Sequence, residues 1–295
     1  MLLSIVIVSF NVKELLVKCL ESIEKYSNGI TKEVIVVDNN SSDNAVLRIR
    51  KDFPKVTLIA NKKNMGFSKA NNQALRIAKG KYLLVLNPDT ELKNDTLSKM
   101  IKFMDENREV AVSTCRVELA DGFLDRDCRR HFPTPWRSFC HFTNLSKIFP
   151  KSKIFDGYYM GYIPDDIEQE VDACAGAFMM IRASAVKKVG YFDEDFFFYG
   201  EDLDWCFRFR QADYRIIYTP ITKIIHYKGA SSGIKKFSQK LSKATKESKK
   251  RVLRESTRAM RLFYDKHYKN VYPFFINWSV YFATWLLEKL RTWNV

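Results

Sequence analysis

The sequence predicts an α/β fold, and three observations support this prediction. The chain has 295 residues, of which 46% are hydrophobic, which is enough to bury a large core. Between residues 1 and 105, short runs of β-branched and apolar residues alternate four times with segments of helical periodicity. This alternation is typical of a parallel sheet covered by helices. We therefore expect one sheet-based domain followed by a charged tail.

Four strand–helix units account for residues 1–105. The expected strands are Ser4–Ser9, Glu33–Asp38, Val56–Ala60 and Tyr82–Leu86. The expected helices are Lys13–Tyr26, Asn44–Lys51, Ser68–Ala78 and Asp95–Glu106. The first run, "LLSIVIVSF", has no basic region before it and no small-residue cleavage site, so we interpret it as a buried strand of a cytoplasmic protein.

The composition limits the classes of partner. A net charge of +15 and a pI near 9.4 indicate an anionic partner, which could be nucleic acid, acidic lipid or a phosphorylated substrate. The six cysteines form no CxxC pair, which argues against a disulfide framework and a structural zinc site. No recognised nucleic-acid-binding motif accompanies the charge, so we do not expect nucleic acid as a partner.

Polar residues follow each expected strand of the first half. These loops are Ser9–Asn11, Val36–Asp43, Asn61–Asn72 and the Asn87-Pro88-Asp89-Thr90 stretch. Because parallel strands end at one edge of a sheet, the four loops would converge on a single crevice. Asn, Pro and Asp also make ordinary turns, and this explanation stays open for the last loop.

The usual nucleotide fingerprints are absent. Neither G-x-G-x-x-G nor a P-loop occurs, which argues against a dehydrogenase and a P-loop ATPase. Asp38 is placed to accept hydrogen bonds from a base or a ribose, although a helix cap or Asx turn would explain it equally well. Gly66 would let the backbone approach a nucleotide closely.

The second half contains an apolar segment, Val171–Arg182, which we expect to be a strand, and an acidic segment, Phe192–Trp205. Six carboxylates lie in the acidic segment beside four consecutive aromatic residues. Glu201 and Asp202 fall in the first turn of a helix expected to run to about Gln211, where the helix dipole favours negative charge. So many carboxylates beside aromatic residues predict a partly apolar pocket in which a pKa is raised for a general base.

Seven motifs in order complete a recognisable pattern. They are "VSFN", "VVDNNSSD", "NMGFSKANN", "LNPDT", "AGAFMMIR", "FDEDFFFYGEDLDWCFR" and "IIHYKGASS". Together they resemble the family 2 inverting glycosyltransferases of GT-A fold, and are most similar to the bacterial rhamnosyltransferase group. The resemblance covers residues 3–233. It implies a catalytic domain at 1–233, with a nucleotide-binding half at 1–105 and an acceptor half at 106–233, and a tail at 234–295.

The resemblance also implies roles for single residues. Asp89 would bind Mg²⁺ or Mn²⁺ on the donor diphosphate and His226 would be a second ligand, although a lone histidine after an apolar run is more often structural. Asn87 replaces the first acidic residue of the D-x-D motif, which lowers the expected metal affinity. The implied donor-binding residues are Ser9, Asn11, Asp38, Asn64, Gly66, Asn72, Asn87 and Asp89. Glu201 and Asp202 would lie at the acceptor, with Asp202 as the base.

The implied reaction is transfer of a sugar with inversion and without a covalent intermediate. The resemblance favours L-rhamnose from dTDP-rhamnose, delivered to a hydroxyl of a saccharide or polyprenyl-linked acceptor in cell-surface polysaccharide synthesis. A UDP-hexose donor is the alternative. A sugar-phosphate nucleotidyltransferase would need a Gly-rich basic loop where this chain has "SFNVKELL". The segment Asp121–Asp166 would form the acceptor-side loops, with Arg126, Arg129, Arg130, His131, Trp136 and Tyr158.

The tail has its own pattern. Lys235–Arg261 contains eleven Lys and Arg against two Glu, a net charge of +9. The following segment, Phe274–Trp293, predicts a helix with aromatic residues on one face: Trp278, Phe282 and Trp285. Its narrow polar stripe consists of Asn277, Thr284, Glu288 and Arg291. This pattern predicts a peripheral contact with the anionic inner face of the cell membrane. A homodimer interface, or packing on the catalytic domain, is the alternative.

Overall fold

The structure, a computed structural model, describes residues 1–228 and 246–293. Its helices are α1 Lys13–Lys25, α2 Ala45–Asp52, α3 Phe67–Ile77, α4 Thr96–Glu106, α5 Pro135–Phe142, α6 Leu145–Ile148, α7 Ala183–Val189, α8 Glu201–Gln211, α9 Lys246–His267 and α10 Phe274–Trp293. Its strands are β1 Leu3–Ser9, β2 Lys32–Asp38, β3 Thr57–Ala60, β4 Tyr82–Leu86, β5 Thr90–Leu92, β6 Val110–Leu119, β7 Gln169–Glu170, β8 Phe178–Arg182 and β9 Arg215–His226. A short 3₁₀ turn covers Arg126–Cys128.

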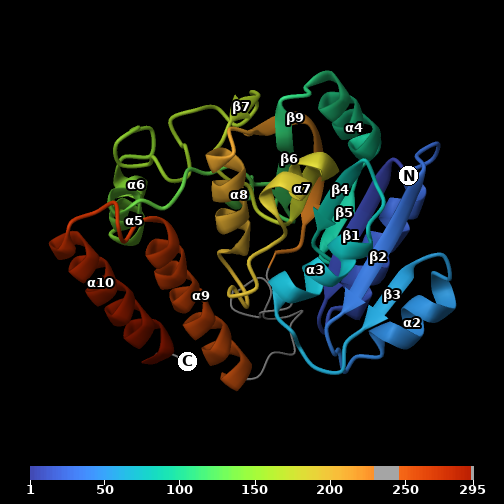
Figure 1. Ribbon diagram of the computed structural model, residues 1–295, viewed down its shortest axis with the longest axis horizontal. Helices are drawn as coiled ribbons and strands as arrows, with labels where there is room; N and C mark the ends of the chain where they lie inside the picture. Colours follow the sequence, from blue (N-terminus) through green and yellow to red (C-terminus); the bar gives the residue numbers. More distant parts are fainter. Residues whose placement is uncertain (229–245, 294–295) are drawn as a thin grey trace.

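The strands form one sheet in the order β3-β2-β1-β4-β8-β6-β9-β5, with β7 on β9 (Figure 1). The first four strands pair in parallel, as the alternation of strands and helices predicts. Strand β8 runs antiparallel between β4 and β6, and it joins the two halves of the sheet. The predicted α/β fold is thus confirmed, and the four predicted strand–helix units match within one residue at each boundary.

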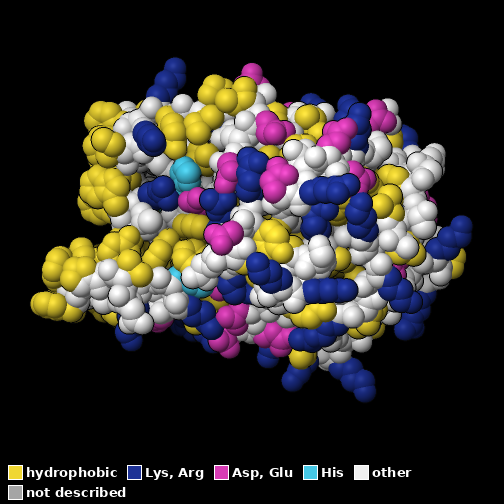
Figure 2. Space-filling view, turned by 45° about the horizontal axis from the view of Figure 1, so that its top comes forward, with side chains coloured by type: hydrophobic (Ala, Val, Ile, Leu, Met, Phe, Trp, Pro, Cys, Tyr) yellow, Lys and Arg dark blue, Asp and Glu magenta, His cyan; other side chains and the backbone are white. Residues whose placement is uncertain are grey.

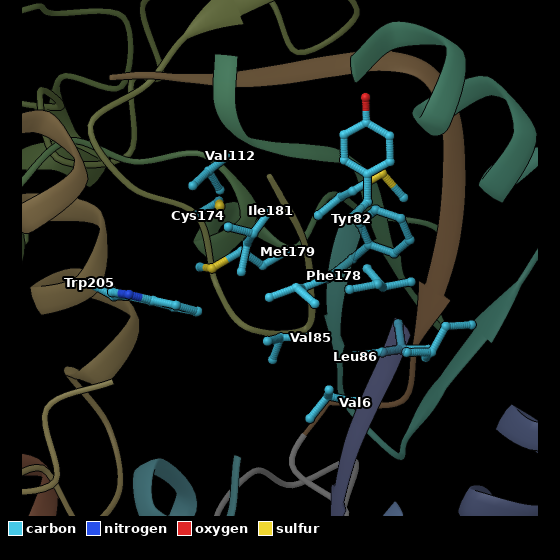
Figure 3. Close-up of a cluster of buried hydrophobic side chains, with 14 of the residues drawn as sticks. Val6, Tyr82, Val85, Leu86, Val112, Cys174, Phe178, Met179, Ile181 and Trp205 are labelled. Carbon is cyan, nitrogen blue, oxygen red and sulfur yellow. The ribbon is translucent and has the colours of Figure 1, made fainter. Parts of the chain in front are cut away.

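The middle of the sheet is the core of the molecule. All seven residues of β1 and all five of β4 are buried, because helices cover the parallel strands. Figure 3 shows Val6 and Val85 of these strands beside Phe178 of β8, with Trp205 of α8 facing the same cluster. This packing fixes where the strands end, and therefore where the polar loops that follow them lie.

The predicted strand Val171–Arg182 is only partly correct. Regular pairing with β4 begins at Phe178. Before it, Ala173 exchanges hydrogen bonds with Arg130, and Ala175 N donates to Asp127 O at 3.1 Å. The small residues ahead of β8 therefore pair with the acceptor-side segment, which brings that segment to the middle of the sheet.

Helix α9 packs on helix α8. Phe263 and Tyr268 are buried against Phe207 of α8, with ring centroids 5.8 and 6.0 Å from it. His267 lies 2.8 Å from Asp204 of the same helix. For α9, these contacts agree with the alternative that the tail packs on the preceding part of the chain. Four basic residues of the predicted tail lie outside the described residues: Lys235, Lys236, Lys240 and Lys243.

Helix α10 completes an antiparallel pair with α9 at the edge of the molecule (Figure 1). Its bounds agree with the predicted helix. Among the described residues, none of the helices combines the length and the apolar character that a membrane crossing requires. The division between residues 233 and 234 stays a prediction, because the junction lies outside the described ranges.

The packing of α9 predicts that it contributes to the stability of the whole fold. Phe263→Ala removes a buried ring and leaves a cavity between α8 and α9, so we expect a loss of about 3–5 kcal/mol of unfolding free energy. Urea unfolding measures this loss. The exposed Phe282→Ala is the matched control, with a change within about 0.5 kcal/mol. A similar small change for both variants would contradict the packing.

Candidate active site

The ends of β1 and β2 form the first part of the candidate site. Ser9 and Asp38 are neighbours in the register of these strands, and both are buried. Asp38 Oδ1 accepts from Ser41 N at 2.9 Å, which is an Asx turn, while Asp38 Oδ2 and Ser9 Oγ have no hydrogen-bond partner among the described residues. Buried polar atoms without a partner are costly. These two atoms are therefore available to a ligand at the carboxyl edge of the sheet.

Asn11 closes the same edge. Its side-chain oxygen accepts from Ser42 N at 2.8 Å, and its own N–H donates to Ser41 Oγ at 2.9 Å. These bonds hold the loop after β1 against the loop after β2. Asn11 thus shapes the edge, and a direct contact with a donor stays a prediction.

The loop before α3 binds the acidic segment of the second half. Gly66 has a φ of +83°, and a Cβ there would lie 2.6 Å from Phe197 O. Asn64 Oδ1 accepts from Gly66 N at 2.9 Å and thereby supports the turn. Asn72 Nδ2 donates to Phe192 O at 2.9 Å and to Glu194 Oε1 at 3.0 Å. The close approach at Gly66 is therefore made by backbone of the same chain, and Asn72 is engaged away from the strand ends.

A carboxylate and an imidazole meet at the far end of this edge. Asp89 follows β4, His226 ends β9, and Asp89 Oδ1 lies 3.2 Å from His226 Nε2. His226 Nδ1 lies 2.9 Å from Asp125 Oδ2, which fixes the ring. Burial lowers the pKa of His226, but the charge of Asp89 and the hydrogen bonds to both carboxylates outweigh it and raise the pKa to about 9. With this raised pKa, His226 holds a proton at neutral pH, and a metal cation bound between Asp89 and His226 would replace that proton.

The donor set fits a cation that is shared with a ligand. Oxygen and imidazole ligands suit Mn²⁺ and Mg²⁺, and a carboxylate on the second ring nitrogen is the usual support of a metal-binding histidine. In residues 1–228 and 246–293, no group of three or more His, Cys, Asp or Glu side chains could hold a metal ion. Asp89 and His226 would therefore need phosphate oxygens to complete the coordination. Asn87 contributes backbone bonds here, donating its N–H to Ala177 O at 3.2 Å.

Three residues beside this pair, Lys228, Asp125 and Asp127, were not predicted from the sequence. Lys228 contacts both Asp125 and Asp127, and it is largely buried with them. Lys228 follows His226 by two residues, so its position in the last motif was an available signal. The two carboxylates come from a segment about a hundred residues earlier, and no local pattern could have indicated that contact.

The acidic segment separates into two groups. Asp193 and Asp195 pair with Lys266, Glu194 with Arg76, and Asp204 with Arg208. These four carboxylates hold the segment to α3, α8 and α9, so their ion pairs explain them without the predicted pocket. Glu201 and Asp202 are the two that lie toward the acceptor-side segment.

Glu201 and Asp202 have different surroundings. Asp202 Oδ2 accepts from Arg130 Nη2 at 2.6 Å, and its Oδ1 accepts from Leu203 N at 2.8 Å. Glu201 is buried, and its Oε2 has no hydrogen-bond partner in the part of the chain that the structure describes. Burial raises the pKa of Glu201 to about 8, and the charge of Asp202 adds to the shift. The predicted carboxyl with a raised pKa is therefore found at Glu201.

An alternating row of charges connects the two parts of the site. Arg130 Nη1 also lies 3.6 Å from Asp127 Oδ1, and Asp127 contacts Lys228. The row therefore runs without a break from the strand-end pair to the acceptor-side carboxylate: Asp89, His226, Asp125, Lys228, Asp127, Arg130 and Asp202.

The polar loops lie at the carboxyl ends of the parallel strands, where open α/β proteins bind their ligands. The family model described as "Glycosyl transferase family 2" matches residues 4–190, which is more than half of the chain. The chain therefore belongs to glycosyl transferase family 2.

Known relatives agree with this assignment. Rhamnosyltransferase WbbL of Escherichia coli K12 is 34% identical over 172 residues, which are 55% of this chain and 61% of WbbL. The dTDP-rhamnosyl transferase RfbF of Shigella flexneri is 27% identical over 203 residues, covering 68% of this chain and 61% of RfbF. The chain thus spans about three fifths of the length of these relatives.

Solved structures support the fold. The mannosyltransferase PcManGT of Pyrobaculum calidifontis, solved with GDP-Man and Mn²⁺, has a TM-score of 0.55 at 17% identity, covering 88% of this chain and 64% of that one. GalNAc-T7, solved with UDP, GalNAc and Mn²⁺, has a TM-score of 0.59 at 16% identity, covering 90% of this chain and 50% of that one. At these identities the likeness shows the shared fold.

The Asp89–His226 pair predicts metal-dependent nucleotide binding. We expect Asp89→Ala and His226→Ala each to weaken the binding of dTDP in the presence of Mn²⁺ by about tenfold or more, because each removes a ligand. Calorimetry with and without Mn²⁺ measures the effect, and Asp121→Ala, on an exposed loop, is the control. Unchanged affinity in both variants would place the metal elsewhere.

The raised pKa of Glu201 predicts a pH-dependent stability. An unfolded glutamate has a pKa of about 4.3, so between this value and about 8 the folded protein holds a proton that the unfolded chain releases. Stability from this group is therefore full at low pH and is lost as the pH rises through about 8. The substitution Glu201→Gln removes this pH-dependent loss of stability, because glutamine does not ionise.

We expect the urea midpoint of Glu201→Gln, relative to that of the unsubstituted protein, to rise steadily as the pH is raised from about 5 to about 9. The exposed Glu106→Gln at the end of α4 is the control and should keep the original pH profile. Parallel profiles for Glu201→Gln and the unsubstituted protein would show that Glu201 is charged throughout this range.

Proposed function

We propose that this glycosyltransferase moves L-rhamnose from dTDP-rhamnose to a hydroxyl of a saccharide or lipid-linked acceptor, with inversion, in cell-surface polysaccharide synthesis. The alternating row of charges from Asp89 to Asp202 is the observation that carries the proposal. It has a donor-binding end beside the strand loops and an acceptor end beside the acidic segment. The names of WbbL and RfbF support the choice of sugar and donor. A UDP-hexose donor is the alternative.

The donor end would hold the nucleotide diphosphate. Ser9 Oγ and Asp38 Oδ2 have unused bonding capacity for the nucleoside. Asp89 and His226 would hold Mg²⁺ or Mn²⁺. The cation, when bound, would neutralise the negative charge that develops on the departing diphosphate. Lys228 adds a positive charge beside this pair.

The acceptor end would supply the base. In one displacement, the acceptor oxygen attacks the anomeric carbon from the face opposite the diphosphate, and the bond to the diphosphate breaks as the new bond forms. Asp202 takes the proton of the attacking hydroxyl. Arg130 and the N–H of Leu203 use only part of the bonding capacity of this carboxylate, so it still has lone pairs for the hydroxyl. These two donors also fix its position.

The buried neighbour, Glu201, would remain protonated at neutral pH because of its raised pKa. A neutral Glu201 does not add a second negative charge beside Asp202. The two carboxyl groups would therefore have different roles: Asp202 would act as the base at the acceptor, and Glu201 would stay uncharged in the interior.

We further propose that the protein works in the cytoplasm on the inner face of the cell membrane, where a polyprenyl-linked acceptor would be presented. The net charge of +15 supports an anionic surface as a partner. A homodimer through the C-terminal helices is the competing explanation of their exposed aromatic residues.

The proposal predicts that Asp202→Asn lowers the turnover number by about 10²- to 10⁴-fold while dTDP binding with Mn²⁺ stays nearly unchanged, because a base acts in the transition state. Transfer or hydrolysis is measured with dTDP-rhamnose and with UDP-glucose, each with and without Mn²⁺. We expect faster turnover with dTDP-rhamnose.

The control for this substitution is Asp195→Asn, which lies in the same acidic segment but is largely exposed. It should retain turnover. Turnover of Asp202→Asn within about threefold of the unsubstituted protein would exclude Asp202 as the base. Turnover with UDP-glucose alone would replace the proposed donor with the alternative.

A further inference from the structure

Helix α10 packs with its polar side inward. Asn277 Oδ1 accepts from Tyr264 OH at 2.5 Å, and Thr284 Oγ1 accepts from Arg261 Nε at 3.0 Å. Glu288 also accepts from Arg261, at 3.1 Å. The polar stripe of the helix is thus bonded to α9. Its aromatic side consequently faces away from the protein.

The outward face of α10 is large and apolar. Its exposed residues are Phe274, Phe275, Trp278, Phe282, Trp285, Leu286, Leu290 and Trp293. Trp278 and Phe282 stack with ring centroids 5.6 Å apart, so the rings form a continuous surface. Exposed apolar areas of this kind mark a binding surface. Because α9 occupies the polar stripe, lipid could not surround α10, and the helix could only lie along a membrane.

A second apolar patch adjoins α10. It comes from α5, α6 and the chain after them, and its exposed members are Trp136, Phe139, Phe142, Ile148, Phe149 and Ile154. Arg291 of α10 lies over the ring of Phe142, 5.6 Å from its centroid, and joins the two areas. Figure 2 shows hydrophobic side chains gathered along the edge of the molecule where α5, α6 and α10 lie.

The charges around these two areas decide between possible partners. Residues 133–155 contain four basic residues and no Asp or Glu, and Lys147, Lys151 and Lys153 are exposed among the apolar side chains. The single acidic residue of α10, Glu288, points to Arg261. A second copy of the chain would bring lysines against lysines, which disfavours association. An anionic lipid surface is complementary to both the charge and the apolar side chains.

We propose that the outer face of α10 and the α5–α6 patch together form a docking surface for an anionic lipid bilayer. This inference rests on the proposed function, because it names the surface from which a lipid-linked acceptor reaches the site. His141 precedes Phe142 of the docking surface, and its ring lies 5.6 Å from that of Tyr158. Tyr158 contacts Arg130, which holds Asp202. A contact path therefore leads from the docking surface to the proposed base.

The test is sedimentation with vesicles of phosphatidylcholine, with and without phosphatidylglycerol. The full-length protein should bind the phosphatidylglycerol vesicles at low salt and less at high salt. The double substitution Trp278→Glu and Trp285→Glu should weaken this binding by about tenfold or more, and Phe149→Glu should weaken it in the same direction. Point substitutions are required because deleting the tail would uncover α8.

The matched control is Leu47→Glu, which introduces the same charge at a residue of α2 that is 64% exposed, and it should bind vesicles normally. Equal vesicle binding by the double variant and the unsubstituted protein would overturn the inference. A dimer in light scattering that the double variant converts to a monomer, without vesicle binding by either, would also overturn it. Tryptophan-dependent vesicle binding without turnover of any nucleotide sugar would support the docking surface and count against the proposed function.

Discussion

The row of alternating charges between β4 and α8 is the interaction on which the candidate site depends. Buried charges are costly unless each has a partner of opposite sign, and in this row every inner group has two. Removing one member would take away one of the oppositely charged partners of each neighbour. The row therefore holds its two ends in place: the strand-end carboxylate Asp89 on one side and the acceptor-side carboxylate Asp202 on the other.

The same constraint explains the acceptor-side segment. Asp125, Asp127 and Arg130 lie within six residues, and they are brought to the middle of the sheet because Ala173 and Ala175 pair with this segment. The apolar residues before β8 therefore serve to place charged side chains. An uninterrupted strand from Val171, which the sequence predicts, would leave Arg130 without its backbone partner.

The sequence predicts the strand–helix units well because each depends on local periodicity and on burial over a few residues. The pair of Asp89 and His226 is predictable only through the order of the motifs, since a lone histidine has no local signature. Contacts such as Lys228 with Asp125 are beyond sequence reasoning, because they depend on how β9 packs beside the 3₁₀ turn. In the acidic segment, by contrast, the sequence indicates more site residues than the structure supports. Glu194 and Asp204 are carboxylates of the kind expected in a site, but each pairs with an arginine, on α3 and α8 respectively, and has a structural role.

The C-terminal helices act on the site as well as on the surface. Arg251 of α9 lies over the ring of Phe197, 4.6 Å from its centroid. The carbonyl of Phe197 accepts from Phe67 N at 2.7 Å, at the start of α3, and Gly66 allows this close approach. The segment that carries Glu201 and Asp202 is therefore held between the donor-side loop and the tail. Because α9 contacts the segment that carries Glu201 and Asp202, a displacement of α9 would be transmitted to these two carboxyl groups. Binding of the adjoining α10 to a membrane, as proposed above, could therefore affect their position.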